Sequence, residues 1–359
     1  MKVCILGSGL TSLSLAKTLI NEGLRVDLFS NNVKNIYDNS QTLGISKNNI
    51  NFFNSNILNI DKLLWDIHKI EIFSENLVNE KILDFEDKKN QLFSVVSNHK
   101  LFNYLLTELK KSKNFYVKRN KNGFGLVNDY DLIINSDFNH QITKRFFYNK
   151  LSKDYKSYGY TTVINHEKIL FNNIATQIFT KKGPLALLPI SENKTSVVYS
   201  ERGSGDITKN ELEDLINKNF KKFKIKSIND FKCFKLKSLN LRSYHHKNIL
   251  AFGDLLHRIH PLAGQGFNMT LRDIKVLVDL IKYNLDLGIQ LDSSICNEFE
   301  KKSKSQNYLF SNGIDLIYEF FNLESKSKTK FMSKSVQFLG KNKSLNKLFS
   351  KLADTGISI

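Results

Sequence analysis

Asp254, Gly264 and Gly266 are the residues whose types and spacing best suit chemistry in this chain. They follow an apolar strand candidate, Asn248 to Phe252, and precede an amphipathic pattern from Asn268 to about Tyr283. A carboxylate at a strand end can accept hydrogen bonds from ligand hydroxyls, and glycines let backbone N–H groups approach a polar ligand closely. The pattern therefore predicts a ligand-binding turn between a strand and a helix.

A second glycine-rich turn opens the chain. Lys2 to Leu6 is an apolar strand candidate, Gly7 and Gly9 belong to the turn after it, and apolar residues then recur at helical spacing as far as Gly23. Arg25 to Phe29 predicts the next strand. These elements predict a βαβ unit of the kind that binds dinucleotides, and the alternative is such a unit without a nucleotide.

Together, the two turns resemble the flavin-binding signatures of the FAD-dependent aromatic hydroxylases, the class A flavoprotein monooxygenases. The closest resemblance is to their ubiquinone-biosynthesis branch. It implies an FAD site in which Asp254 holds the ribityl chain and the loop from Pro261 to Asn268 lies against the isoalloxazine ring, with NAD(P)H as co-substrate. The cofactor-binding residues that it implies are Gly7, Gly9, Leu10, Thr11, Ser12, Ser30, Gln41, Asp254, Pro261, Gly264, Gln265, Gly266, Phe267 and Asn268.

Four positions depart from the family pattern. Ser12 stands for the third glycine of G-x-G-x-x-G, Ser30 for the acid that binds ribose, and Gln41 for an arginine. The segment from Asn135 to Phe138 replaces a Gly-Ala-Asp-Gly turn. These departures predict weakened or lost flavin binding.

The resemblance also covers the segment from Gly183 to Pro189, which is similar to the family's substrate sheet beside the flavin. The substrate-binding residues implied there are Leu185, Leu187, Leu188 and Pro189. Alternating strand residues fit a core equally well, so this assignment has an alternative.

The fold expected is α/β, with a βαβ-based FAD-binding lobe, an inserted and mostly antiparallel substrate sheet, and a helical C-terminal tail. The expected FAD-binding domain comprises residues 1–60, 90–146 and 245–285. Residues 61–89 and 147–244 would form the substrate domain, and residues 286–359 the helical C-terminal segment.

Local patterns predict further elements. Helix candidates are Asp61 to Ile67 and Asn98 to Lys110, the latter with leucines on one face. Thr208 and Glu211 have the spacing of a capping box and predict a helix start. Strand candidates cluster from Tyr155 to Ser200.

The net charge is +18, and lysine supplies most of the basic residues. From Lys326 to Lys351 there are eight lysines and no acid, interleaved with apolar residues at helical spacing. This pattern predicts peripheral contact with an anionic membrane, and the alternative is a tail packed on the body. The stretch from Glu324 to Lys330 is the expected hinge before this tail, and deleting the tail is expected to leave flavin bound.

Other features limit location and partners. Cys4, Cys233 and Cys296 are isolated, and no run of 18 apolar residues occurs, so we expect a cytoplasmic protein, free or on the inner face of the membrane. No arginine-rich aromatic module suggests a nucleic-acid partner. We expect no metal site.

No side chain can be assigned as the catalyst from its motif, because neither G-x-S-x-G nor H-E-x-x-H is present. His260 could donate a hydrogen bond to the flavin or substrate, or brace its loop. The favoured function is hydroxylation of a polyprenylated phenol on the way to ubiquinone, within a biosynthetic complex if one forms. The alternatives are hydroxylation of a soluble aromatic acid and a non-catalytic scaffold.

Overall fold

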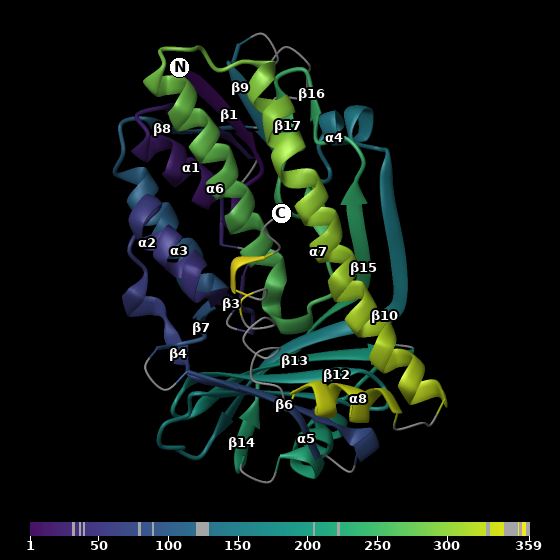
Figure 1. Cartoon of the computed structure of the whole chain (residues 1–359). Coiled ribbons are helices and arrows are strands. Elements are labelled where there is room, and N and C mark those ends of the chain that lie inside the picture. The colour runs from purple at the N-terminus through teal and green to yellow at the C-terminus, as the bar shows by residue number, and fades with distance from the viewer. Residues whose placement is uncertain are drawn as a thin grey trace.

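The computed structural model describes residues 1–30, 33–35, 37–38, 40–77, 80–87, 90–119, 129–203, 205–220, 223–327, 331–340, 351 and 354–356. A lobe built on a parallel sheet stands above a lobe built on a broad, mostly antiparallel sheet, and helix α7 runs from one to the other (Figure 1). The expected α/β fold with an inserted antiparallel sheet and a helical C-terminal region is confirmed.

The first sheet has the strand order β16-β17-β9-β1-β2-β8, and its β17, β9, β1, β2 and β8 run parallel. Its strands are β1 (Lys2–Leu6), β2 (Arg25–Phe29), β8 (Phe115–Lys118), β9 (Leu132–Asn135), β16 (His245–His246) and β17 (Ile249–Ala251). Helices α1 (Leu10–Asn21), α3 (Asn98–Lys110) and α6 (Gln265–Asp286) accompany it. Strands β1 and β2 and helix α3 have the bounds that the sequence predicts.

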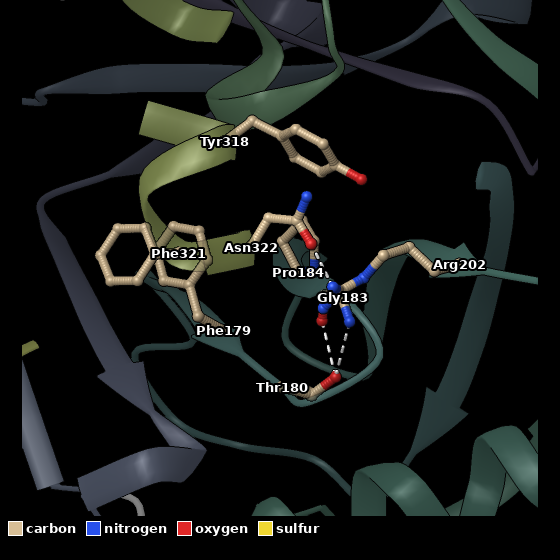
Figure 2. A pocket seen from close by; sticks show the side chains of 8 residues that line it. All are labelled: Phe179, Thr180, Gly183, Pro184, Arg202, Tyr318, Phe321 and Asn322. Atoms are coloured by element: carbon tan, nitrogen blue, oxygen red, sulfur yellow. Dashed lines mark hydrogen bonds between the residues drawn. The ribbon is translucent and has the colours of Figure 1, made fainter. Parts of the chain in front are cut away.

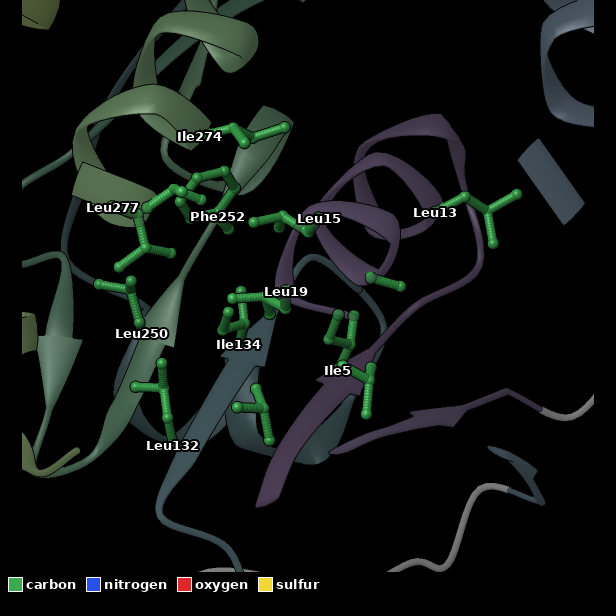
Figure 3. Close-up of a cluster of buried hydrophobic side chains, with 14 of the residues drawn as sticks. Ile5, Leu13, Leu15, Leu19, Leu132, Ile134, Leu250, Phe252, Ile274 and Leu277 are labelled. Carbon is green, nitrogen blue, oxygen red and sulfur yellow. The ribbon is translucent and has the colours of Figure 1, made fainter. Parts of the chain in front are cut away.

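The core of this lobe lies between the sheet and its helices. Figure 3 shows Leu15 and Leu19 of α1 directed towards Ile134 of β9 and Phe252, which follows β17. All four side chains are buried. Strands covered on both faces are continuously apolar, which explains the uninterrupted hydrophobic run in β1.

The second sheet has nine strands, in the order β18-β15-β10-β13-β12-β11-β5-β6, with β14 beside β10. Its strands are β5 (Lys69–Ser74), β6 (Glu80–Glu86), β10 (Lys150–His166), β11 (Ile174–Phe179), β12 (Pro184–Ser191), β13 (Lys194–Arg202), β14 (Ile225–Ile228), β15 (Lys232–Leu241) and β18 (His257–Arg258). Helix α5 (Lys209–Asn219) packs against one face, and the capping box of Thr208 and Glu211 is formed as predicted.

A small sheet, in the order β3-β7-β4, lies beside helix α2 (Lys47–Asn56). Its strands are β3 (Thr42–Ser46), β4 (Trp65–Ile67) and β7 (Phe93–Ser97). The expected helix from Asp61 to Ile67 is wrong, since only Asp61–Leu63 form a short 3-10 turn before β4. The indole N–H of Trp65 donates to the carbonyl of Asn172 at 2.7 Å, and Ile67 is buried, so tertiary contacts hold this segment extended.

Helices dominate the C-terminal region. Helix α4 (Gln141–Phe146) belongs to the first lobe. The helices after β18 are α6, α7 (Ser293–Ser327) and α8 (Phe331–Gly340). The expected hinge at Glu324 is wrong, because α7 continues through it and its side chain is fully buried, accepting a 2.7 Å hydrogen bond from the Ser333 amide. Residues 328–330 of that hinge lie outside the described residues.

The last described residues return to the first lobe. A carboxylate oxygen of Asp354 accepts a hydrogen bond from the Asn48 amide at 2.9 Å, in the first turn of α2. The carbonyl of Asp354 accepts one from the Ser46 hydroxyl at 3.0 Å. This end of the chain therefore packs on the body.

Candidate functional site

The two predicted glycine turns meet at one edge of the parallel sheet. Leu6 ends β1 and Ala251 ends β17, so the turns leave the same carboxyl edge, where open α/β sheets bind ligands. Gly253 has φ +64°, and a Cβ there would lie 2.8 Å from the Thr11 methyl group. The structure thus brings the N-terminal turn and the Asp254 turn into contact.

Ser12 occupies the position of the missing third glycine. Its hydroxyl lies 2.7 Å from the hydroxyl of Ser136, which also donates to the carbonyl of Leu6 at 3.1 Å. Gly7 has φ +117°, and a Cβ there would lie 2.5 Å from the Ser136 oxygen. The segment that replaces Gly-Ala-Asp-Gly therefore closes over the turn through this serine pair.

The N-terminus of α1 has no capping side chain of its own and no acidic residue in its first turn. The amide of Leu10 donates instead to the hydroxyl of Tyr37 at 3.3 Å. A Cβ on Gly9 would lie 3.3 Å from that same hydroxyl. Nothing in the sequence pattern singles out Tyr37, and only the folded chain reveals it here.

Asp254 lies in an open position. Its side chain is 68% exposed and 4.0 Å from the Nε atom of Arg258, whose guanidinium stacks on Phe138. Ser30 and Gln41 contribute backbone contacts: the Ser30 amide donates to the Lys118 carbonyl, and the Gln41 carbonyl accepts from the Asn98 amide.

The loop before α6 is fixed by its asparagine. Gly264 takes φ +62° and caps α6, while a Cβ on Gly266 would meet no atom within 4 Å. Asn268 is buried, and its amide donates to the carbonyls of Gly44 at 2.8 Å and Gly264 at 3.2 Å. Its side-chain oxygen accepts from the Ser46 amide at 2.9 Å. Asn268 therefore ties the loop to β3, and open space lies at Gly266.

The remaining loop residues divide between surface and core. Pro261 is partly exposed, Phe267 belongs to the core of the first lobe, and Gln265 is buried with its side-chain oxygen lacking a hydrogen-bond partner within the described part of the chain. An unpaired buried acceptor marks a place that a ligand or water could satisfy.

His260 is held in an aromatic clamp. Its ring stacks on Tyr318 of α7 with centroids 4.2 Å apart and meets Tyr155 of β10 edge-on at 5.1 Å. The side chain is only 1% exposed, and burial lowers its pKa to about 3, so the ring is neutral at physiological pH. Tyr155 donates to the carboxylate of Asp315, which anchors the clamp to α7.

A second buried histidine links the lobes. His257 of β18 contacts the carboxylate of Asp273 of α6 at 2.5 Å, and the amide of Asn307 of α7 donates to the same carboxylate at 2.9 Å. The spacing of His257 and Asp273 in the sequence matches no motif, so the pair could not be predicted from it. Within the described residues, no cluster of histidine, cysteine and acidic residues could hold a metal ion.

The predicted substrate leucines point to different places. Leu185 and Leu187 are buried in the core beneath α5, with Tyr160 and Leu212. Leu188 lies on the opposite face of β12, against the cluster of Ile67, Val95 and Ala175. Pro189 is buried at the far end of β12. The structure therefore does not gather these four side chains at one pocket.

A small pocket opens between the second sheet and α7. Figure 2 shows Tyr318 and Asn322 of α7 facing Gly183 and Arg202 of the sheet. Its lining residues are Phe179, Thr180, Gly183, Pro184, Arg202, Tyr318, Phe321 and Asn322. Because Tyr318 also stacks on His260, one wall of this pocket touches the glycine loop.

The arrangement of lobes is that of flavin-dependent monooxygenases of known structure. The p-nitrophenol 4-monooxygenase PnpA from Pseudomonas putida matches with a TM-score of 0.78, at 12% identity, over 99% of this chain and 98% of that chain. HpxO from Klebsiella pneumoniae, solved with FAD and uric acid, matches with a TM-score of 0.75, at 12% identity, over 99% and 97% of the two chains.

Residues 141–341, more than half of the chain, match the family model described as squalene epoxidase, and the chain belongs to that family. Among curated proteins it is similar to the 3-demethoxyubiquinol 3-hydroxylase of Escherichia coli, 28% identical over 158 residues, 40% of this chain and 39% of that protein. The ubiquinone biosynthesis monooxygenase COQ6 of Drosophila melanogaster is 23% identical over 232 residues, 53% of this chain and 49% of that protein.

The chain thus spans less than half of the length of these two relatives. Their names confirm the relationship to ubiquinone-biosynthesis hydroxylases that the two glycine turns predict.

Proposed function

We propose that this chain is an FAD- and NAD(P)H-dependent monooxygenase that hydroxylates the aromatic ring of a polyprenylated phenol in ubiquinone biosynthesis. The observation that carries this proposal is the contact between the two glycine turns, at Gly253 and Thr11, in a relative of ubiquinone hydroxylases. Their meeting places the N-terminus of α1 and the carboxylate of Asp254 at one edge of the sheet.

The residues at this edge fit an FAD molecule. The first turn of α1 contains no acidic side chain, and the N-cap residue Gly9 has no side chain that could cap it. The Asp254 side chain is exposed, and a Cβ on Gly266 would meet open space. Backbone amides at Leu10 and Thr11 would hold the diphosphate, Asp254 the ribityl hydroxyls, and the loop from Pro261 to Gly266 the ring. Bound there, the flavin supplies the redox and oxygen chemistry.

The side chains of this protein would orient the reactants and exclude water. Asn268 fixes the glycine loop, and Tyr155 and Tyr318 enclose His260 behind it. The neutral His260 ring can donate one hydrogen bond but cannot serve as an acid charged at neutral pH, since burial lowers its pKa to about 3. Its role is therefore to support the loop or to donate to a bound group.

The pocket beside α7 favours an apolar substrate portion. Phe179, Pro184 and Phe321 line it, and the rings of Phe179 and Phe321 stack with centroids 3.6 Å apart. A soluble aromatic acid would need a charged anchor, for which Arg202 is the cation in the lining. Its guanidinium already donates to the carbonyls of Lys181 and Lys182, which supports the prenylated phenol over the acid.

Peripheral membrane contact through the lysine-rich tail remains part of the proposal, as does membership of a biosynthetic complex. No helix of the described residues is long and apolar enough to cross a membrane. On α8, Lys334 is exposed and Phe338 is 76% exposed, which suits contact with an anionic surface. Lys328, Lys330, Lys341, Lys343 and Lys347 lie outside the described residues. Sedimentation with anionic vesicles should therefore fall as salt rises.

Purified protein should carry or take up one noncovalent FAD, seen as its visible absorption. A host that lacks a ubiquinone-pathway ring hydroxylase should recover ubiquinone with this chain but not with the Gly264→Val form. Valine is strained at φ +62°, and the Cβ at this position lies 3.5 Å from the Gly44 amide nitrogen.

Gly288→Val is the matched control, because Gly288 takes φ +69° with no atom within 4 Å of its Cβ position. A flavin-loaded protein that rescues no host would favour the soluble-acid hydroxylase. If the folded protein never binds flavin, the non-catalytic scaffold is the alternative that remains.

A further inference from the structure

Tyr37 occupies the place where a dinucleotide would meet helix α1. Its hydroxyl accepts the hydrogen bond of the Leu10 amide at 3.3 Å, and it would lie 3.3 Å from a Cβ on Gly9. In βαβ units the diphosphate of the ligand sits at this helix N-terminus. The phenol oxygen therefore takes an N–H group that the diphosphate would need.

The phenol of Tyr37 is protonated where it meets the helix. Burial raises the pKa of Tyr37 and outweighs the hydrogen bond from the Leu10 amide, which lowers it; the negative charge of Asp254 raises the pKa further. Tyr37 is consequently a neutral phenol at physiological pH, and it accepts from the Leu10 amide, one of the groups that would hold the diphosphate.

Helix α3 holds Tyr37 in this position. Its ring packs against Phe102 with centroids 5.8 Å apart, and its carbonyl contacts the Nδ1 atom of His99 at 3.0 Å. Its amide donates to the side chain of Asn35 at 3.0 Å, and Asn35 in turn donates to Asn103 at 2.9 Å. These contacts make the position of the phenol a built feature of the fold.

We propose that Tyr37 is a self-contained cap of α1 that competes with FAD and must leave the Leu10 amide before the diphosphate can bind. This inference rests on the proposed function. The exchange is favourable, because a diphosphate is a charged acceptor and forms stronger hydrogen bonds than a neutral phenol. The binding free energy is less favourable than at an uncapped helix, however, because the hydrogen bond between Tyr37 and Leu10 is lost.

The competition has a consequence for affinity. With Ser30 in place of the acid that binds ribose, no carboxylate at the end of β2 compensates for the bond lost at Leu10. FAD should thus bind this chain less tightly than its glycine turns alone would suggest, and the flavin-free protein should be stable by itself.

Titration of the full chain with FAD and with riboflavin tests the inference, because riboflavin has the ring and ribityl chain but no diphosphate. Tyr37→Phe removes the competing hydroxyl and should tighten FAD binding about two- to tenfold while leaving riboflavin affinity unchanged. Tyr104→Phe makes the same chemical change on α3 and should alter neither affinity.

Equal effects on FAD and riboflavin, or weaker FAD binding by Tyr37→Phe, would overturn the inference, since the hydroxyl would then support the flavin. Should no variant bind either flavin, the proposed function itself fails, and the inference with it. Thermal unfolding of the flavin-free protein gives a second readout: Tyr37→Phe should lower the melting temperature, because the Leu10 amide loses its partner. An unchanged melting temperature would contradict the capping role.

Discussion

Ser12 and Ser136, 124 residues apart in the chain, share a hydrogen bond of 2.7 Å between their hydroxyl oxygens. One stands where the N-terminal motif usually has its third glycine, and the other stands in the segment that replaces Gly-Ala-Asp-Gly. The two departures from the family pattern are therefore partners. The Ser136 hydroxyl gives Ser12 a hydrogen-bond partner in a turn that usually has glycine at this position.

The serine pair should show coupling in a double-mutant cycle. Ser12→Ala and Ser136→Ala should each lower the free energy of unfolding, and the double variant should lose less than their sum by about 0.5–1.5 kcal/mol, the net worth of a hydrogen bond. Urea unfolding of the four proteins measures this coupling. Strict additivity would mean that the two hydroxyls stabilise the fold independently.

Asp254→Ala should weaken FAD binding about ten- to a hundredfold. Its exposed carboxylate would form a charge-assisted hydrogen bond with the ribityl chain, worth about 1.5–3 kcal/mol. Fluorescence titration gives the dissociation constant. Asp214→Ala, on the exposed surface of α5, is the control. The assignment of Asp254 fails if both variants bind flavin like the unmodified chain.

Asp354 should support the glycine loop from the other end of the chain. It accepts from the Asn48 amide and the Ser46 hydroxyl, and the Ser46 amide donates to Asn268. Asp354→Ala should lower the free energy of unfolding by about 1–2 kcal/mol, since a carboxylate at a helix N-terminus and its hydrogen bond are both lost.

The same variant should also bind FAD more weakly, because Asn268 fixes the loop at Gly264. Asp279→Ala, at an exposed position of α6, should change neither quantity. If a chain truncated after Gly340 binds flavin normally, the tail does not support the flavin site, as the sequence alone suggests.

Asp27 should make stability depend on pH in the acid range. Burial alone would raise its pKa, but the ammonium of Lys118 at 2.6 Å and the hydroxyl of Tyr130 at 2.7 Å hold it below its ordinary value of 3.8. A depressed pKa in the folded state means that the contribution is complete above about pH 4 and is lost as pH falls through the folded pKa.

Asp27→Asn should therefore lose about 1.5–3 kcal/mol at pH 7 and differ much less from the unmodified chain at pH 3 or below. Urea unfolding at both pH values is the measurement, with the exposed Asp214→Asn as control. A constant difference between the two proteins across this range would show that the carboxylate is not stabilised in the folded state.

The sequence predicts elements well where local signals agree with burial. Strands β1 and β2, helix α3 and the capping box at Thr208 follow directly from their patterns. It fails at Trp65, where a contact with Asn172, more than a hundred residues away, overrides helical spacing. Leu185 and Leu187 show a different limit, because alternation predicts a strand but not which face meets a ligand.

The site itself divides in the same way. Gly7, Gly253 and Gly264 are recognisable because their backbone conformations leave a signature in sequence. Tyr37, Tyr155 and Tyr318 leave none, since an aromatic residue that contacts a distant helix or loop looks like any other aromatic residue until the chain has folded.

Helix α7, with 35 residues, contacts both lobes and connects them rigidly. Asn307 near its middle is bonded to Asp273 in the upper lobe, while Tyr318 and Asn322 line the pocket against the lower sheet. Hinging one lobe away from the other would break the stack of Tyr318 on His260. Movement of one lobe relative to the other should therefore be small, and a cross-link between the turn from Thr180 to Gly183 and α7 should leave the protein folded.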